Sequence, residues 1–347
     1  MKIIAVTNQK GGVGKTTTAT AMAAGLKQRG YRVLLGDMDP QSNSTDTYRA
    51  KIEDQATLFD VLCAGDKISE AIQHTDAGDI VASDPLLADA ERRMTEQGRE
   101  FRLKEALEEI ENDYDYIVLD TPPGLGILLT NALTAATSCV IPVSADRYAL
   151  QGLSGLDKSI ARVRKYSNRD LKIDGLLLCK YNPNLNLSKT VMEAMRTVAK
   201  NLGTKTFSTT IRETVAAKEA QAARMTLFEA APTCTAARDY NRFLDEYLYD
   251  SEGIYMTPYG ILQKARAFHE EGGLFRLTET DSQWGIRFEY GDLSAFIYSK
   301  PEGCVFAQCS NRGEEKTLVL AGRQTFSGEN AQTAQSVCDF VLNFVRE

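Results

Sequence analysis

The strongest constraint on the fold is the segment 10–17, which reads KGGVGKTT. An apolar run, KIIAV at 2–6, precedes this segment, and an Ala-rich helical pattern near 15–29 follows it. A loop that leaves a strand and enters a helix can direct several backbone N–H groups at one phosphate, provided that glycines let the chain come close. The order of these elements therefore predicts a phosphate-binding loop (P-loop) at the start of an α/β domain.

The residues of this loop have separate expected roles. Lys15 supplies a positive charge to the β and γ phosphates, the Thr16 hydroxyl is placed to hold Mg²⁺, and Thr17 supports the α-phosphate. The expected cofactors are ATP and Mg²⁺, and the expected nucleotide-binding residues are Gly11, Gly12, Val13, Gly14, Lys15, Thr16 and Thr17. The loop alone thus predicts an ATP-binding protein.

The loop departs from the general pattern GxxxxGK[ST] at its first position. Gln9 occupies the place where that pattern has a glycine, and a second lysine, Lys10, follows it. The combined pattern xKGGxGKT is narrower than the general one, so it points to a smaller group of nucleotide-binding proteins.

Two acidic motifs support the same interpretation. GDMDPQSN at 36–43 follows the second strand, and YDYIVLDTPPG at 114–124 is an apolar strand that ends in Asp120. Ligands of open α/β sheets bind at the carboxyl ends of the strands, where both motifs lie. Asp37 and Asp39 point the same way by strand alternation, so both can face the metal or the attacking water, and Asp120 is the natural Mg²⁺ partner of a P-loop threonine. The expected metal-binding residues are Thr16, Asp37 and Asp120.

Strands and helices alternate through most of the 347 residues, which is the pattern of βαβ units. We expect residues 1–249 to form a doubly wound α/β domain with a mostly parallel sheet, because its strands are unbroken apolar runs. After a linker at 250–257 the pattern changes to five strand-like runs between helices near 258–271 and 329–346. Residues 258–347 are therefore predicted to be a small α+β domain.

With these motifs in hand, residues 1–249 resemble the ParA/Soj branch of the deviant Walker A ATPases, which position plasmids and chromosomes. The resemblance rests on NQKGGVGKTT, DMDPQSNST and YDYIVLDTPPGLG. It implies ATP hydrolysis, slow and stimulated by a partner, with Lys10, Lys15 and Asp39 as the catalytic residues. Lys10 would be the signature lysine, which reaches the partner's nucleotide in an ATP-dependent homodimer, and Asp120 would bind Mg²⁺ through water.

The resemblance also implies partners: DNA bound without sequence preference, and a ParB-like adaptor. The chain has a net charge of −7, but residues 180–224 contain eight basic and three acidic residues, a local charge of +5. The candidate DNA contacts are Lys189, Arg196, Lys200, Arg212, Lys218 and Arg224. A solvated helix face is the alternative explanation of this stretch. The implied location is cytoplasmic, with nucleoid association in the ATP-bound state.

Two departures weaken the expectation of partner-stimulated turnover. Gly124 stands where many relatives have serine, and the stretch after Ile211 is only loosely similar to the family. A MinD-like ATPase that positions a protein or membrane-associated cargo is the alternative function. Its basic membrane helix is not expected here, because the predicted closing helix is acidic and no apolar run approaches the length needed to cross a bilayer.

Cysteine usage argues against a metal or cluster site. The seven cysteines are scattered, and none forms a CxxC pair followed by further ligands. An iron–sulfur scaffold would need such cysteines in loops, whereas Cys139 lies in a strand-like run. We expect the seven cysteines to be reduced thiols.

Which cargo the chain would position is left open by the sequence.

Overall fold

The computed structural model describes residues 1–146 and 153–252, together with five strands between residues 276 and 321. The side chains of residues 186, 189 and 249 onward are outside this description, so the predicted DNA contact Lys189 lies outside the described residues. The predicted helices near 258–271 and 329–346 also lie outside them. The chain divides into two compact units, Met1–Lys27 with Tyr31–Tyr240, and Gln28–Gly30 with Asn241–Glu347.

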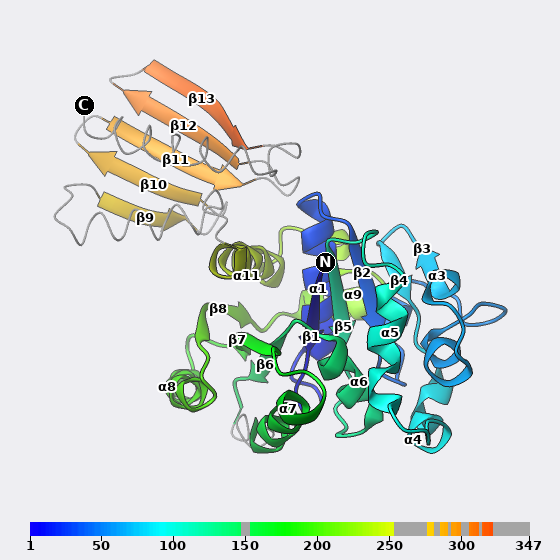
Figure 1. Cartoon of the computed structure of the whole chain (residues 1–347). Coiled ribbons are helices and arrows are strands. Elements are labelled where there is room, and N and C mark those ends of the chain that lie inside the picture. The colour runs from blue at the N-terminus through cyan, green and yellow to red at the C-terminus, as the bar shows by residue number, and fades with distance from the viewer. Residues whose placement is uncertain are drawn as a thin grey trace. The chain divides into compact units, whose positions relative to one another are not determined.

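The first unit is built on an eight-stranded sheet in the order β3-β4-β2-β5-β1-β6-β7-β8 (Figure 1). Neighbouring strands are parallel, except that β3 is antiparallel to β4. The strands are β1 (Lys2–Val6), β2 (Val33–Asp37), β3 (Ile72–His74), β4 (Asp79–Val81), β5 (Tyr116–Asp120), β6 (Ser138–Ser144), β7 (Lys172–Tyr181) and β8 (Thr206–Arg212). The predicted doubly wound, mostly parallel sheet is confirmed.

Helices cover both faces of this sheet. Since parallel crossovers are right-handed, the connections that step toward β8 place α6, α7 and α8 on one face, and the step back from β1 to β2 places α1 on the other. The α-helices are α1 (Lys15–Gln28), α2 (Asn43–Thr47), α3 (Ile68–Ala71), α4 (Ala90–Arg93), α5 (Arg102–Glu108), α6 (Ile127–Ala135), α7 (Leu153–Tyr166), α8 (Asn186–Asn201), α9 (Val215–Ala222), α10 (Leu227–Ala230) and α11 (Thr235–Glu252). Three other helical turns are η1 (Asp60–Ala64), η2 (Pro85–Asp89) and η3 (Arg99–Phe101).

The central strands are buried on both faces. Every residue of β2, β5 and β6 is buried, and so are four of the five residues of β1. Continuous burial explains why these strands appear in the sequence as unbroken apolar runs and not as an alternating pattern. Asp37 and Asp120, at the ends of β2 and β5, are also buried, although aspartate is rarely fully buried unless it is paired.

The sequence analysis did not identify β3 or β8. β3 has only three residues, and in β8 buried residues alternate with more exposed ones, many of them threonine or serine. Both strands lie at the edges of the sheet, where one-sided pairing leaves a weaker apolar signal. The short helices α2, α9 and α10 were also not predicted.

The second unit contains a five-stranded antiparallel sheet in the order β13-β12-β11-β10-β9. Each strand pairs with its neighbour in sequence, which makes the sheet a meander. The strands are β9 (Arg276–Thr280), β10 (Gly285–Tyr290), β11 (Leu293–Ser299), β12 (Val305–Asn311) and β13 (Glu314–Ala321). They overlap the five strand-like runs of the sequence. The domain limits at 249 and 258 stay predictions.

Packing of β7 against β8 gives a test of the fold. A Cβ added at Gly175 would lie 2.7 Å from Cε2 of the buried Phe207 ring. We expect Gly175→Ala to lower the free energy of unfolding by about 1–3 kcal/mol, the usual cost of overpacking a core. Urea unfolding followed by circular dichroism measures this change.

The matched control is the double variant Gly175→Ala/Phe207→Leu, in which the smaller side chain leaves room for the new methyl group. We expect the double variant to lose less stability than the sum of the losses in the two single variants. Unchanged stability in Gly175→Ala would show that this contact does not limit the packing of the two strands.

Candidate functional site

The predicted P-loop connects β1 to α1. Its first residues are anchored by Asn8, whose Nδ2 donates to the Pro142 carbonyl (2.7 Å) and whose Oδ1 accepts from the Lys10 amide (3.0 Å). Gly12 and Gly14 have φ angles of 72° and 101°, in the region that favours glycine. The path of the loop therefore depends on these two glycines and on an anchor to β6.

Lys15, the first residue of α1, is buried, and its Nζ donates to the Lys10 carbonyl within the loop (3.3 Å). Burial lowers the pKa of this lysine, and the negative charges of Asp120 and Asp39 partly oppose that change. The loop thus holds a buried ammonium group between a backbone carbonyl and two carboxylates.

Asp37 and Asp120 are register partners at the carboxyl ends of neighbouring strands β2 and β5. Asp37 is fully buried, and its Oδ2 accepts from both the amide and the hydroxyl of Thr45 (2.8 Å each). Its Oδ1 accepts from the Asp39 amide (3.1 Å). Burial and the charge of Asp120 raise the pKa of Asp37. The contacts show that Asp37 fixes the segment that follows β2.

Asp120 retains a free buried oxygen. Its Oδ2 accepts from the Ser44 hydroxyl (2.8 Å), but its Oδ1 has no hydrogen-bond partner in the described part of the chain. Burial raises the pKa of Asp120, and hydrogen bonds from Ser44 and the nearby Thr16 lower it. A buried carboxylate oxygen beside a hydroxyl fits the coordination shell of Mg²⁺, which is bound through few protein oxygens and several waters.

Asp39 lies just beyond β2 and is 8% exposed. Its Oδ1 accepts from the Gln41 amide (3.0 Å). A carboxylate has about four acceptor positions, so this contact leaves capacity for a water molecule. The three predicted carboxylates thus differ: Asp37 is bonded to the backbone around it, Asp120 has an unpaired oxygen, and Asp39 is close to the surface. Within the described ranges, no cluster of three His, Cys, Asp or Glu residues forms a self-sufficient metal site.

Lys10 is paired within its own chain. Its Nζ forms an ion pair with Asp146, which follows β6 and also accepts from the Ser144 hydroxyl. The side chains of Lys10 and Asp146 are 26% and 44% exposed, so the pair lies at the surface of the site. The sequence analysis assigned no role to Asp146.

Gln9 connects the loop to a helix. A Cβ added at Gly155 of α7 would lie 2.4–2.8 Å from the amide atoms of Gln9. The Gln9 amide therefore packs directly against the backbone of α7, and a side chain at position 155 would displace it. The non-glycine residue of this P-loop has a packing partner that the sequence pattern did not reveal.

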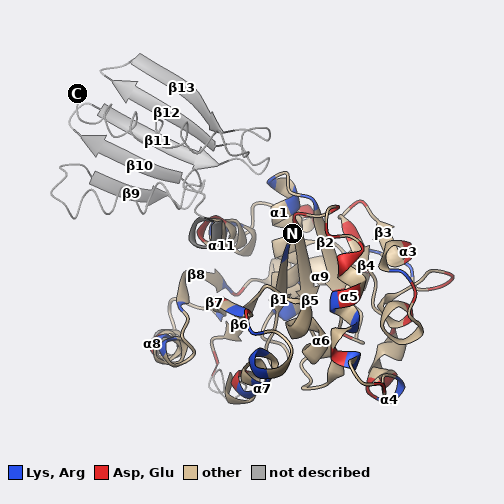
Figure 2. Ribbon diagram, in the orientation of Figure 1, with Lys and Arg blue, Asp and Glu red and all other residues tan. Residues whose placement is uncertain are grey.

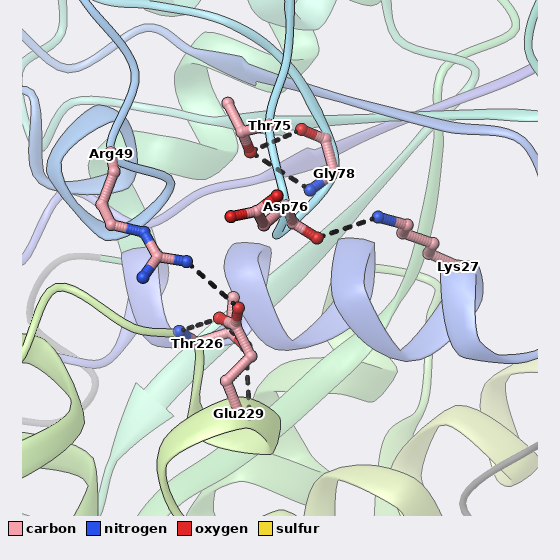
Figure 3. Close-up of polar contacts among 7 residues, drawn as sticks. All are labelled: Lys27, Arg49, Thr75, Asp76, Gly78, Thr226 and Glu229. Atoms are coloured by element: carbon pink, nitrogen blue, oxygen red, sulfur yellow. Dashed lines mark hydrogen bonds and ion pairs between the residues drawn. The ribbon is translucent and has the colours of Figure 1, made fainter.

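Two ion pairs connect the segment after Asp39 to the segment α9–α10. Arg224 contacts Asp46 of α2 (3.2 Å), and Arg49 contacts Glu229 of α10 (3.4 Å). Figure 3 shows the Arg49–Glu229 contact beside Thr226, whose amide and hydroxyl both donate to Glu229. The capping box at Thr226 therefore orients the carboxylate that receives Arg49.

The predicted DNA contacts have different environments, and Figure 2 shows how basic residues are distributed on the ribbon. Arg212 makes a bidentate contact with buried Asp239 (2.7 and 3.0 Å), and Arg224 is paired with Asp46. Arg196 and Lys200 are exposed on α8, and Lys218 is exposed on α9. Among the predicted contacts with described side chains, these three are exposed and take part in no described ion pair.

The described part of the chain contains no helix that is both long enough and apolar enough to cross a membrane.

The sequence of this chain was compared with family models and with known proteins. A family model described as an AAA domain matches residues 1–173. The chain is 42% identical over 223 residues to sporulation initiation inhibitor protein Soj of Bacillus subtilis (strain 168), a match that covers 63% of this chain and 87% of Soj. It is 36% identical over 245 residues to chromosome-partitioning ATPase Soj of Thermus thermophilus, covering 71% and 94% of the two chains.

A solved structure shares the fold and carries a nucleotide. Cobyrinic acid a,c-diamide synthase from Mycobacterium smegmatis, with bound ADP and magnesium, aligns with a TM-score of 0.63 at 30% identity. The alignment covers 73% of this chain and 96% of the synthase. The sheet order, the P-loop and the extent of identity to both Soj proteins lead to one conclusion: the chain belongs to the ParA/Soj family of partition ATPases.

Proposed function

We propose that this protein is a partition ATPase that binds Mg²⁺-ATP, dimerises on ATP, and hydrolyses it to ADP and phosphate. The observation that carries the proposal is the arrangement around Lys15: a buried ammonium group in a glycine-containing loop, facing two carboxylates at the carboxyl edge of the sheet. Family membership supports it. Each residue of the site then has a role that follows from its contacts.

In this proposal the amides of Gly11 to Thr17 bind the phosphates, and Lys15 neutralises the β and γ oxygens. Thr16 and Asp120 hold Mg²⁺, which neutralises phosphate charge when bound, and Asp37 supports them from the neighbouring strand. Asp39 orients the attacking water, because its carboxylate is fixed by Gln41 and still has free acceptor positions.

Substitutions at Lys15 and Asp39 separate binding from hydrolysis. We expect Lys15→Ala to abolish ATP binding, because it removes the charge that faces the phosphates. Asp39→Ala is expected to bind ATP normally but to turn it over at least about 100-fold more slowly, since a positioned group contributes about that factor or more. Calorimetry of nucleotide binding and a phosphate-release assay measure the two effects.

The matched control is Lys27→Ala, at the opposite end of α1, where the lysine donates a hydrogen bond to the Asp76 carbonyl (3.3 Å). This variant should bind and hydrolyse ATP like the wild type. Normal turnover by Asp39→Ala would contradict the role assigned to Asp39.

We further propose that Lys10 reaches the nucleotide of a second copy in the ATP-bound dimer. Its side chain is partly exposed at the edge of the site, and its present partner, Asp146, lies on the same surface. Exchange of one ion pair for another at a surface costs little, because exposed pairs contribute about 0–1 kcal/mol. Lys10 can therefore leave Asp146 when a phosphate is available.

Removal of this lysine tests the dimer. We expect Lys10→Ala to bind ATP but to remain a monomer, measured by size-exclusion chromatography with light scattering in ATP and Mg²⁺. Asp146→Asn is the companion variant: it leaves Lys10 without its carboxylate partner and should dimerise at least as readily as the wild type. An ATP-dependent dimer of Lys10→Ala would rule out the cross-dimer role.

The proposed cargo partners are non-specific DNA and a ParB-like adaptor that stimulates hydrolysis. Exposed Arg196, Lys200 and Lys218 support a DNA-binding surface within residues 180–224. Such a protein would be cytoplasmic and associated with the nucleoid when ATP is bound. The region 258–347 is the proposed place for cargo choice. A MinD-like role with a protein or membrane-associated cargo is the alternative if DNA is not bound.

A further inference from the structure

Helix α7 carries a basic stripe that lies outside the stretch 180–224. We define the α7 stripe as Lys158, Arg162 and Lys165, with Arg169 just past the end of the helix. The three helical residues follow one another at intervals of four and three, so they lie on one face. All four side chains are exposed, whereas the opposite face of α7 is buried in the core through Leu156, Ile160 and Val163.

Within the described part of the chain, the α7 stripe forms no ion pair with a carboxylate. Among the described residues, none of its four members takes part in an ion pair, whereas Arg212 and Arg224 both do. Helix α7 contains four basic residues and one acidic residue in a chain with a net charge of −7. A helix dipole favours cations only in the last turn, which accounts for Lys165 but not for Lys158 or Arg162. Figure 2 shows these basic positions along α7.

An exposed aromatic ring lies beside Lys165 at the C-terminal end of α7. Tyr166 is 70% exposed, and Nζ of Lys165 lies 5.0 Å from the centroid of its ring. The contact holds the lysine at the surface without neutralising it. From Lys158 to Lys165 the stripe is about 10 Å long, because a helix rises about 1.5 Å per residue. That length matches about three base pairs of duplex DNA, at about 3.4 Å per phosphate along one strand.

Helix α7 also contacts the phosphate loop. The Gln9 amide packs against Gly155, which lies three residues before Lys158. The phosphate loop and the first turn of α7 are therefore in direct contact.

We propose that the α7 stripe binds the phosphates of duplex DNA, as a second contact surface beside the one on α8. The inference rests on the proposed DNA-binding function and specifies where part of the binding occurs. Arginine and lysine side chains on an exposed helix contact backbone phosphates without reading sequence.

The test compares two triple variants with the same change in charge. One is Lys158→Gln/Arg162→Gln/Lys165→Gln in the α7 stripe. The control is Lys51→Gln/Lys67→Gln/Lys104→Gln, three exposed lysines elsewhere in the first unit. Binding to a random-sequence DNA duplex is measured by fluorescence anisotropy in ATP and Mg²⁺ between 50 and 200 mM salt, together with ATP hydrolysis.

We expect the α7 variant to bind DNA about 10-fold or more weakly than the wild type, and its plot of log affinity against log salt to be flatter by about 2–3 units. The control should keep the wild-type slope within about half a unit. Hydrolysis without DNA should be unchanged in both variants, because neither set touches the nucleotide site.

Equal slopes for the wild type and the α7 variant would overturn the inference while leaving the proposed function intact. An equal loss in both triple variants would also overturn it, since the effect would then be one of total charge. Binding of the wild type to phosphatidylglycerol vesicles that the α7 variant loses, with DNA binding unchanged, would assign the stripe to a membrane instead. Absence of DNA binding by the wild type in every nucleotide state would contradict the proposed function and the inference together.

Discussion

The site depends on one unfavourable arrangement: an ammonium group buried next to carboxylates at the carboxyl edge of a parallel sheet. Burial of an ion costs several kcal/mol unless partners compensate for it. Lys15 is compensated by the Lys10 carbonyl and by the charges of Asp39 and Asp120. These groups come from the loop, from the segment just after β2 and from the end of β5. Their attraction for the Lys15 ammonium group therefore holds the phosphate loop against the central strands. The order β2-β5-β1 in the sheet thus brings the carboxylates beside the phosphate loop and also forms the centre of the core.

Much of this arrangement could be predicted from the sequence. The strands β1, β2, β5 and β6 are covered on both faces, so their apolar runs are unbroken and easy to recognise. The P-loop and the two aspartate motifs follow these strands directly, which places them at one edge. Identity over most of the two Soj proteins then confirmed the family.

The contacts that distinguish the site could not be predicted in the same way. Lys10–Asp146 and Gln9–Gly155 join residues more than 130 positions apart, and no local pattern indicates which side chains meet. The same holds for Arg212, which appeared in the sequence as a free positive charge and is bonded to Asp239 in the structure. Periodicity identifies the face of a helix; the partner of each side chain depends on the tertiary fold.

If ATP in this site controls the DNA-binding form, DNA binding must depend on which nucleotide is present. Binding of the wild-type protein to a random-sequence duplex is measured with ATP, with ADP and without nucleotide, at two salt concentrations. We expect tight binding with ATP alone, weakened steeply by salt as contacts with phosphates require. Equal affinity in all three states would contradict the central claim that ATP in this site controls the DNA-binding form.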